Sequence, residues 1–222
     1  QPFLELEPQP LALIGTKPAD LISLIRLVLA DALQDANLTL PIPDCGIVIG
    51  SSRGFQGNLE QLLRGKREEG SSATDVTDVT DVTDGWKKEE NSQFPIPNSQ
   101  FLDFLPHMGA IAAAREIGST GPVKAPMAAC ATGIWSIAQA VELIQTGQCQ
   151  LVVAGAVEAP ITPLTLTGFK RMGALAKTGC YPFDRGREGF VLGEGGALFV
   201  LESADLAMSR GAKIYGRVLG FG

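Results

Sequence analysis

Residues 123–156 constrain the fold more than any other part of the chain. They begin with an apolar, strand-like run at 123–128 and continue through an alanine- and isoleucine-rich helical pattern at 131–145. They end in a second apolar run at 151–156. The helical segment is hydrophobic on nearly all sides, which is typical of a helix buried between layers. We therefore expect an α/β protein in which buried strands alternate with helices in stacked layers.

The rest of the chain continues this alternation. Apolar residues at helical spacing predict a helix over residues 21–38, with Asp20 as its N-cap. The same reading predicts further helices at 54–63, 103–117, 162–171 and 204–210, and further strands at 46–52, 197–202 and 213–220. Residues 1–18 are interrupted by prolines and are expected to be irregular.

Cys130 lies where the first apolar run becomes the helical segment. A thiol at a helix start is close to unpaired backbone N–H groups and to the positive end of the helix dipole, and both favour the thiolate. Gly133 would let this helix start approach a substrate or another backbone closely. The residues alone indicate either a reactive nucleophile or a small buried hydrophobic side chain.

Four segments around Cys130 resemble the β-ketoacyl-acyl-carrier-protein synthases in order and spacing. Residues 121–133 (GPVKAPMAACATG) are similar to the nucleophile segment of that family. Residues 147–158 match its G-x-x-D-x-x-x-A-G-G-x-E strand, with Gln150 in place of the aspartate. Residues 182–195 match P-F-D-x-x-R-x-G-F-V-x-G-E-G, and residues 211–222 resemble the strand that ends the first half of the family's fold.

The resemblance implies a thiolase-like layered fold, α-β-α-β-α, of which this chain would supply most of the N-terminal half. The expected domain is residues 1–222, incomplete at both ends. Family members that decarboxylate malonyl thioesters carry two catalytic histidines in their second half, whereas this chain has one histidine, His107. We therefore expect a fragment that is inactive on its own, and we expect His107 to be a packed core residue without a catalytic role.

The resemblance also assigns candidate site residues. Cys130 would be the catalytic nucleophile. Arg53, in the loop Gly50-Ser-Ser-Arg-Gly54, occupies the position of a residue that gates the acyl pocket; it could shorten this pocket, bind a polar acyl group or point to solvent. Phe169 has the spacing of an aromatic that lines the pocket. Three charged residues between the glycines of the 182–195 block would support the site structurally: Asp184, Arg187 and Glu194.

The implied activity is acyl transfer to Cys130, followed by decarboxylative condensation with a malonyl unit in fatty-acid or polyketide synthesis. The implied partners are an acyl carrier protein bearing acyl or malonyl thioesters and a second copy of the chain. No cofactor or metal is implied. Two alternatives stay open: an inactive module for acyl binding or dimerisation, and a thiolase-type acyltransferase, which the 182–195 block disfavours.

Composition limits the other function classes. The formal net charge of −6 argues against nucleic-acid binding. No apolar stretch approaches the ~20 residues of a membrane span. Cys45, Cys130, Cys149 and Cys180 show neither metal-ligand spacing nor a disulfide framework, so a reducing, cytoplasmic location is expected.

Residues 66–92 differ in character from the rest of the chain. They are charged and polar and contain a Thr-Asp-Val repeat between Thr74 and Asp84. Such a composition cannot bury enough apolar surface to offset the entropy of ordering, so we expect a flexible insertion. The recurring aspartates suggest calcium as an alternative, but their spacing matches no EF-hand loop and has no glycine at its turn.

Overall fold

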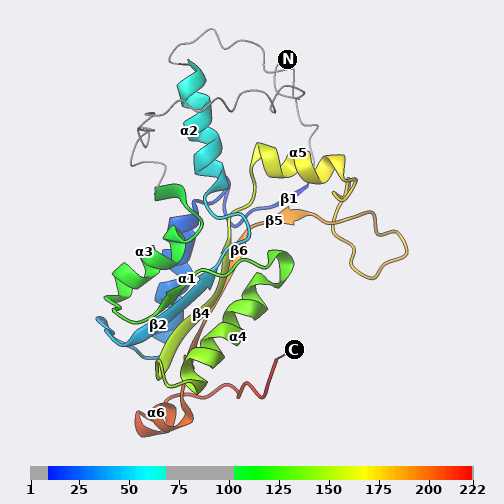
Figure 1. Ribbon diagram of the computed structural model, residues 1–222. Helices are drawn as coiled ribbons and strands as arrows, with labels where there is room; N and C mark the ends of the chain where they lie inside the picture. The colour runs from blue at the N-terminus through cyan, green and yellow to red at the C-terminus, as the bar shows by residue number, and fades with distance from the viewer. Residues whose placement is uncertain (1–9, 69–102, 222) are drawn as a thin grey trace, which may run out of the picture.

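The computed structural model of the protein describes residues 10–68 and 103–221 (Figure 1). Its helices are α1 (Leu21–Asp35), α2 (Gln56–Glu68), α3 (Met108–Ile117), the 3-10 helix η3 (Ala129–Ala131), α4 (Thr132–Gln145), α5 (Pro163–Arg171) and α6 (Ala204–Ser209). Its strands are β1 (Leu11–Ala12), β2 (Cys45–Gly50), β3 (Val123–Lys124), β4 (Leu151–Glu158), β5 (Leu192–Gly193) and β6 (Gly195–Glu202). The predicted alternation of strands and helices is confirmed.

The central sheet has four strands in the order β3-β2-β4-β6. Strands β2 and β4 run parallel, with Cys45 paired to Leu151 and Gly50 to Ala156. Strand β3 is also parallel to β2, whereas β6 is antiparallel to β4. The carboxyl ends of β2, β3 and β4 therefore meet at one edge of the sheet, which is where open α/β sheets commonly place ligands.

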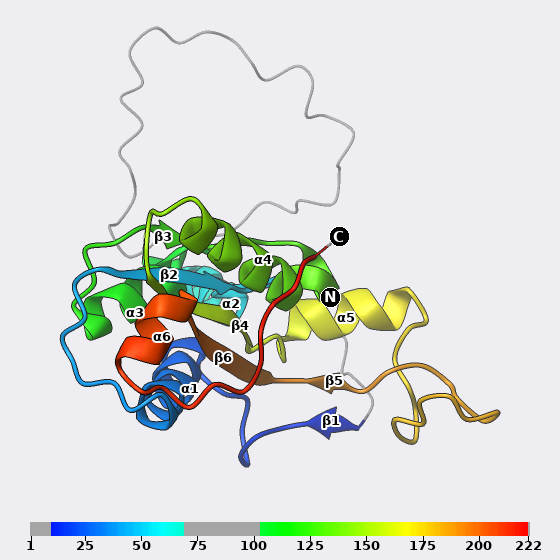
Figure 2. The same cartoon turned by 90° about the horizontal axis from the view of Figure 1, so that it is seen from below.

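Helices cover the two faces of this sheet. Helix α4 packs on one face, against β2 and β4, while α1 and α3 pack on the other (Figure 2). Alternate residues of a strand point to opposite faces. In β2, Ile47 and Ile49 accordingly join the core under α1 and α3, and Val48 joins the core under α4. The described chain thus forms three layers, α-β-α.

Helix α1 forms as its sequence predicts. Its apolar residues recur at three- and four-residue spacing and are buried, among them Leu24, Ile25 and Leu29. The Asp20 carboxylate accepts a hydrogen bond from the Ser23 backbone N–H at 2.9 Å, which satisfies one of the unpaired donors at the helix start. The predicted N-cap is therefore confirmed, and the helix ends at Asp35, three residues earlier than predicted.

Two predicted strands differ from the structure. The strand predicted at 123–128 is limited to Val123–Lys124, because the chain leaves the sheet before Pro126, which has no N–H for a ladder bond. The strand predicted at 213–220 is wrong, since these residues follow α6 as an exposed segment with no ladder partner in the described part of the chain. Conversely, Leu11 and Ala12, predicted to be irregular, pair with β5.

Helix α4 is buried on one side only. Ile134 and Trp135, on its outer face, are 73% and 51% exposed. The prediction of burial between two layers is therefore wrong for the described residues, because they supply a single sheet for this helix to pack on. Three further boundaries also moved: α2 continues to Glu68, α3 begins only at Met108, after Pro106, and α5 begins at Pro163. Beyond Glu68, the expected insertion lies outside the described residues.

Candidate active site

Cys130 lies in a tight turn between β3 and α4, where the sequence predicts it. The turn consists of residues 126–132 and is called here the nucleophile turn. Cys130 is exposed and is the middle residue of η3, two residues before Thr132, the first residue of α4. Ala129, the preceding residue, has φ of 48°, a left-handed conformation that costs an L-residue roughly 1–2 kcal/mol. The thiol is thus presented at a helix start on a strained backbone.

Thr132 fixes the shape of this turn. Its hydroxyl donates to the Ala129 carbonyl at 2.7 Å and accepts from the Ala128 N–H at 3.0 Å. The side chain is only 2% exposed, so these bonds are shielded from water. Sequence reasoning did not assign Thr132 a role. The available signal was a hydroxyl residue two positions after the cysteine, at the start of a helix.

The end of β2 packs directly against the nucleophile turn. A Cβ added at Gly50 would lie 2.5 Å from the Pro126 carbonyl oxygen and would also overlap the Thr132 methyl group. Only glycine permits this approach, because any side chain would push the strand and the turn apart. The loop that follows Gly50, residues 51–54, is therefore adjacent to the turn that carries Cys130.

Glu158, the last residue of β4, holds the 51–54 loop. Its carboxylate accepts hydrogen bonds from the Ser51 hydroxyl at 3.2 Å and from the Ser52 backbone N–H. The Ser51 hydroxyl in turn accepts from the Gly54 N–H at 2.9 Å. Sequence reasoning included Glu158 in a family motif without giving it a role. Its partners are more than 100 residues away, so no local pattern reveals them.

The structure brings together the two residues predicted to line the acyl pocket. The Arg53 guanidinium carbon lies 5.4 Å from the centroid of the Phe169 ring, within the range of a cation–π contact. Phe169 is on α5, whose N-cap Thr162 accepts from the Thr165 N–H. The Phe169 ring also meets Phe190 edge to face, with centroids 4.9 Å apart. Arg53, Phe169 and Phe190 thus form one stack built from three separate segments.

The three charged residues of the 182–195 block do not form one network. Asp184 and Arg187 bond within their own turn: the Asp184 carboxylate accepts from the Gly186 N–H, and Arg187 Nη1 donates to the Asp184 carbonyl oxygen at 3.0 Å. The Glu194 carboxylate instead accepts from the backbone N–H groups of Ile14, at 3.1 Å, and Ala19, at 2.8 Å. None of these hydrogen bonds involves the nucleophile turn, and the role of the three residues in supporting the site stays a prediction.

The other three cysteines differ in environment. Cys45 and Cys149 are buried, and burial raises the pKa of Cys149 and raises that of Cys45 to about 11. Such thiols stay protonated at neutral pH and are poor nucleophiles. Cys180 is exposed, like Cys130, but lies in a surface loop far along the chain from the helix start. All four cysteines are free thiols.

His107 does not belong to the core. It is exposed at the residue before α3, and its side chain makes no capping hydrogen bond. The expectation of a packed core histidine is therefore wrong, because the helix begins at Met108 and its apolar face is formed by later residues such as Ala110 and Ile117.

The described part of the chain offers neither a metal site nor a membrane span. Within residues 10–68 and 103–221, no group of three or more His, Cys, Asp or Glu side chains is arranged to hold a metal ion. In the same part of the chain, every helix is too short or too polar to cross a bilayer.

Solved structures with a similar fold are ketosynthases. One contains a type II PKS acyl carrier protein in complex with its ketosynthase bound to the hexaketide; it has a TM-score of 0.72 and 26% identity, covering 92% of this chain and 49% of that one. A β-ketoacyl synthase from Burkholderia phymatum gives a TM-score of 0.62 and 28% identity, covering 87% of this chain and 43% of its own. The described layers therefore belong to a thiolase-like fold, of which this chain is most of the N-terminal half.

Curated relatives carry the same kind of name. A 3-oxoacyl-(acyl-carrier-protein) synthase 2 from Staphylococcus aureus is 40% identical over 123 residues, which are 53% of this chain and 30% of that protein. The enzyme of the same name from Synechocystis is 37% identical over 136 residues, or 59% of this chain and 32% of its own. The matches thus span about a third of the curated relatives' length.

A family model matches most of the chain. The model describes the N-terminal domain of beta-ketoacyl synthases and matches residues 20–207, from the residue that caps α1 to α6. This range includes the nucleophile turn, Glu158, and the stack of Arg53, Phe169 and Phe190. The resemblance predicted from the four sequence segments is thereby confirmed, and the chain belongs to the beta-ketoacyl synthase N-terminal domain family.

Proposed function

We propose that this protein acts in a β-ketoacyl-acyl-carrier-protein synthase and that Cys130 is the residue that accepts the acyl group. The observation that carries the proposal is the exposed Cys130 thiol, held at the start of α4 by a strained turn. A helix start stabilises the thiolate, and a fixed turn presents it to an incoming thioester. Membership of the synthase family supplies the reaction class.

The first half-reaction is transfer of an acyl group. The Cys130 thiolate attacks the carbonyl carbon of an acyl thioester, a new C–S bond forms, and the bond to the donor's sulfur breaks. The departing thiolate takes up a proton. We expect the backbone N–H of Cys130 to be one donor to the oxyanion, an interaction whose loss typically costs ~10²–10³ in rate.

The second half-reaction forms the carbon–carbon bond. A malonyl thioester loses carbon dioxide, and the resulting carbanion attacks the carbonyl of the acyl-cysteine. The bond to Cys130 breaks, which frees its thiolate and leaves a β-ketoacyl thioester. In this family two histidines from the second half of the fold assist the step. His107 is exposed at the start of α3, and we assign it no role in the reaction.

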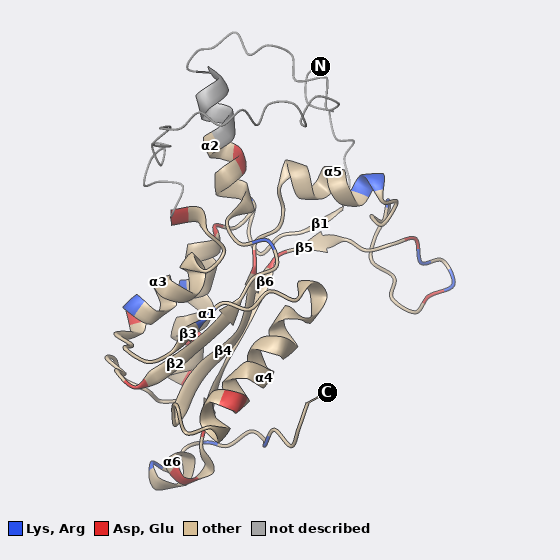
Figure 3. Ribbon diagram, in the orientation of Figure 1, with Lys and Arg blue, Asp and Glu red and all other residues tan. Residues whose placement is uncertain are grey.

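The proposed donor is an acyl carrier protein. A ketosynthase of similar fold has been solved in complex with one. In this chain, Lys170 and Arg171 form a basic end on α5, visible as the blue segment of that helix in Figure 3. This end follows Phe169 directly, so it is suited to receive an acidic carrier next to the acyl pocket.

The family suggests the oligomeric state of this protein, and its free cysteines suggest its cellular location. We propose a homodimer, to be measured by analytical ultracentrifugation. We place the protein in the cytoplasm, in keeping with four free cysteines. The domain assignment of residues 1–222, with an insertion near 66–92, remains part of this proposal.

The experiment is acylation followed by intact-protein mass spectrometry. The purified protein is mixed with an acyl-carrier-protein thioester, and the adduct is mapped by peptide digestion. We expect one acyl group on Cys130 and none in Cys130→Ala. Cys180→Ala is the matched control, because Cys180 is the other exposed thiol. An adduct on Cys180, or one that persists in Cys130→Ala, would show that the assignment is wrong.

A further inference from the structure

Arg53 carries a positive charge that no carboxylate of the described residues pairs with. Two other arginines are ion-paired: Arg210 bonds both oxygens of Glu202 at 2.7 Å, and Arg26 bonds Glu116 at 3.0 Å. Arg53 is exposed, and no ion pair of its guanidinium is found within residues 10–62 and 103–221. Its contact in this region is the ring of Phe169.

Contacts of the loop hold Arg53 in place from both sides. Before it, Ser51 and Ser52 donate to the Glu158 carboxylate. After it, the Gln56 N–H donates to the Arg53 carbonyl oxygen at 3.2 Å, which ties the residue to the start of α2. A ligand that binds the guanidinium therefore does not have to order this loop first, which removes one cost of binding.

The contact with Phe169 leaves the donors of Arg53 available. A guanidinium presents five N–H donors in its plane, and a cation–π contact places the group over the ring without using these donors for hydrogen bonds. Two of them match the two oxygens of a carboxylate. Phe169 and Phe190 add an apolar surface next to this cation, suited to the methylene groups of an acyl chain.

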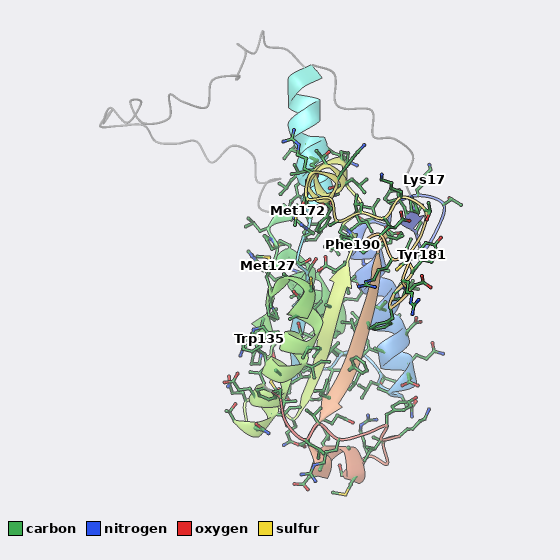
Figure 4. The ribbon with its side chains drawn as sticks, turned by 90° about the vertical axis from the view of Figure 1, so that its right-hand side faces the viewer. Lys17, Met127, Trp135, Met172, Tyr181 and Phe190 are labelled. Atoms are coloured by element: carbon green, nitrogen blue, oxygen red, sulfur yellow. The ribbon has the colours of Figure 1, made fainter. Side chains whose placement is uncertain are left out.

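The stack lies at the same end of the molecule as the nucleophile turn. The loop that carries Arg53 begins at Gly50, which packs against Thr132, two residues after Cys130. In Figure 4, Met172, Phe190 and Met127 of the nucleophile turn all lie in the upper half of the molecule, above Trp135. An acyl chain bound to Cys130 and extending along the aromatic rings would thus end near a cation.

We propose that Arg53 makes this site prefer acyl groups that end in a carboxylate over methyl-terminated acyl groups of the same length. The inference rests on the proposed acylation of Cys130 and adds the class of substrate. A bidentate, charge-assisted pair between Arg53 and the terminal carboxylate lowers the free energy of the donor bound at the site. We expect the carboxylate donor to acylate Cys130 roughly tenfold to a hundredfold faster than the methyl donor.

The test uses two thioesters of N-acetylcysteamine, one with an ω-carboxylate and one with a terminal methyl group at equal chain length. These donors contain no phosphate, so the acyl end is the only anion. The rate of Cys130 acylation is measured by intact mass for the unmodified protein, Arg53→Met and Arg26→Met. Arg26 is the matched control because it is an exposed arginine that pairs with Glu116 in the α1 and α3 layer, on the face of the sheet opposite α4.

We expect the unmodified protein and Arg26→Met to prefer the carboxylate donor, and we expect Arg53→Met to lose this preference, which is measured as the ratio of the two donors' rates within each protein. Acylation of Cys130 without any preference, or a preference that persists in Arg53→Met, would overturn the inference and leave the proposed function intact. No acylation with any donor would overturn both. Circular dichroism melting of each variant confirms that the exposed substitution leaves the fold unchanged.

A second pair of donors tests another source of negative charge. The same two acyl groups are supplied as phosphopantetheine thioesters, which carry a phosphate. If Arg53→Met slows both of these equally and affects neither N-acetylcysteamine donor, Arg53 binds the phosphate of the donor, and the proposed selection of the acyl end is wrong.

Discussion

The nucleophile turn and the loop at residues 176–191 both match motifs of one family, but different forces hold them. The turn is closed by the buried Thr132 side chain and is in contact with the core strand β2 through Gly50. The ends of the loop are joined by a hydrogen bond from the Ala176 N–H to the Phe190 carbonyl oxygen. Beyond these ends the loop is held by exposed groups, since the Glu188 carboxylate accepts from the Thr178 hydroxyl and N–H. At its tip, Phe183 is fully exposed.

This difference indicates what each motif contributes. The turn depends on packing, so its shape is determined by residues of the described chain. The loop depends on hydrogen bonds in water, which contribute little net stability, and it presents an apolar side chain outward. If the two segments differ in this way, changes in the turn should alter stability and thiol reactivity more than changes in the loop.

The largest effect is expected for Gly50→Ala. The added methyl group would lie 2.5 Å from the Pro126 carbonyl oxygen, so strand and turn must separate. Overpacking of this kind costs typically ~1–3 kcal/mol, and we expect the upper end of this range in urea denaturation. The control is Gly186→Ala in the loop, where the nearest atom is the exposed Asp184 carboxylate oxygen at 3.2 Å. Equal losses in the two variants would contradict the comparison.

The second prediction concerns the thiols. Cys45 is buried with a pKa of about 11, so its thiolate fraction at neutral pH is at least ~100-fold below that of an ordinary thiol at ~8.5. We expect iodoacetamide to label Cys130 first, Cys180 second, and the buried Cys45 and Cys149 only after denaturation. Peptide mapping over time measures the order. Faster labelling of Cys180 than of Cys130 would remove the special status of the turn.

The third prediction is a gain in stability from Ala129→Gly. Ala129 adopts a left-handed φ of 48°, which glycine adopts without steric cost. Glycine also makes the unfolded chain more flexible, which offsets part of this stabilisation. We therefore expect a net gain of up to ~1 kcal/mol in unfolding free energy. Ala131→Gly, two residues later with φ of −92°, should instead lose ~0.5–1 kcal/mol. Losses in both variants would show that the turn is not strained.

The smallest effect is expected at Glu188. Hydrogen bonds from the Thr178 hydroxyl and N–H lower its pKa below the ordinary value. A lowered folded-state pKa means that these bonds close the loop at neutral pH and are lost as pH falls through that pKa. The Thr178 amide resonance should therefore titrate at a pH below that of an ordinary glutamate, and not at all in Glu188→Gln. Because the group is exposed, global stability should hardly change.

Local patterns in the sequence predicted much of the fold. The spacing of apolar residues located α1, and Asp20 marked its start. The change of period near residue 130 located the turn and α4. Such features depend on neighbours three or four residues away, so the chain displays them directly.

Features that depend on distant partners were not predictable in this way. Glu158 bonds residues more than 100 positions away, and its role emerged only from the parallel pairing of β2 and β4. The strand predicted at 213–220 has a suitable composition but no neighbour to pair with in the described chain. Strand formation depends on a partner, and no pattern within a segment supplies one.

The pairing of β1 with β5 has a consequence for folding during synthesis on the ribosome. Leu11 pairs with Leu192, and the Glu194 carboxylate that holds Ile14 follows it by 180 residues. A ribosome that adds ~5–20 residues per second needs roughly 10–40 s between these positions. Strand β1 therefore leaves the ribosome well before its partner β5, and during that interval it is open to chaperones and to neighbouring nascent chains.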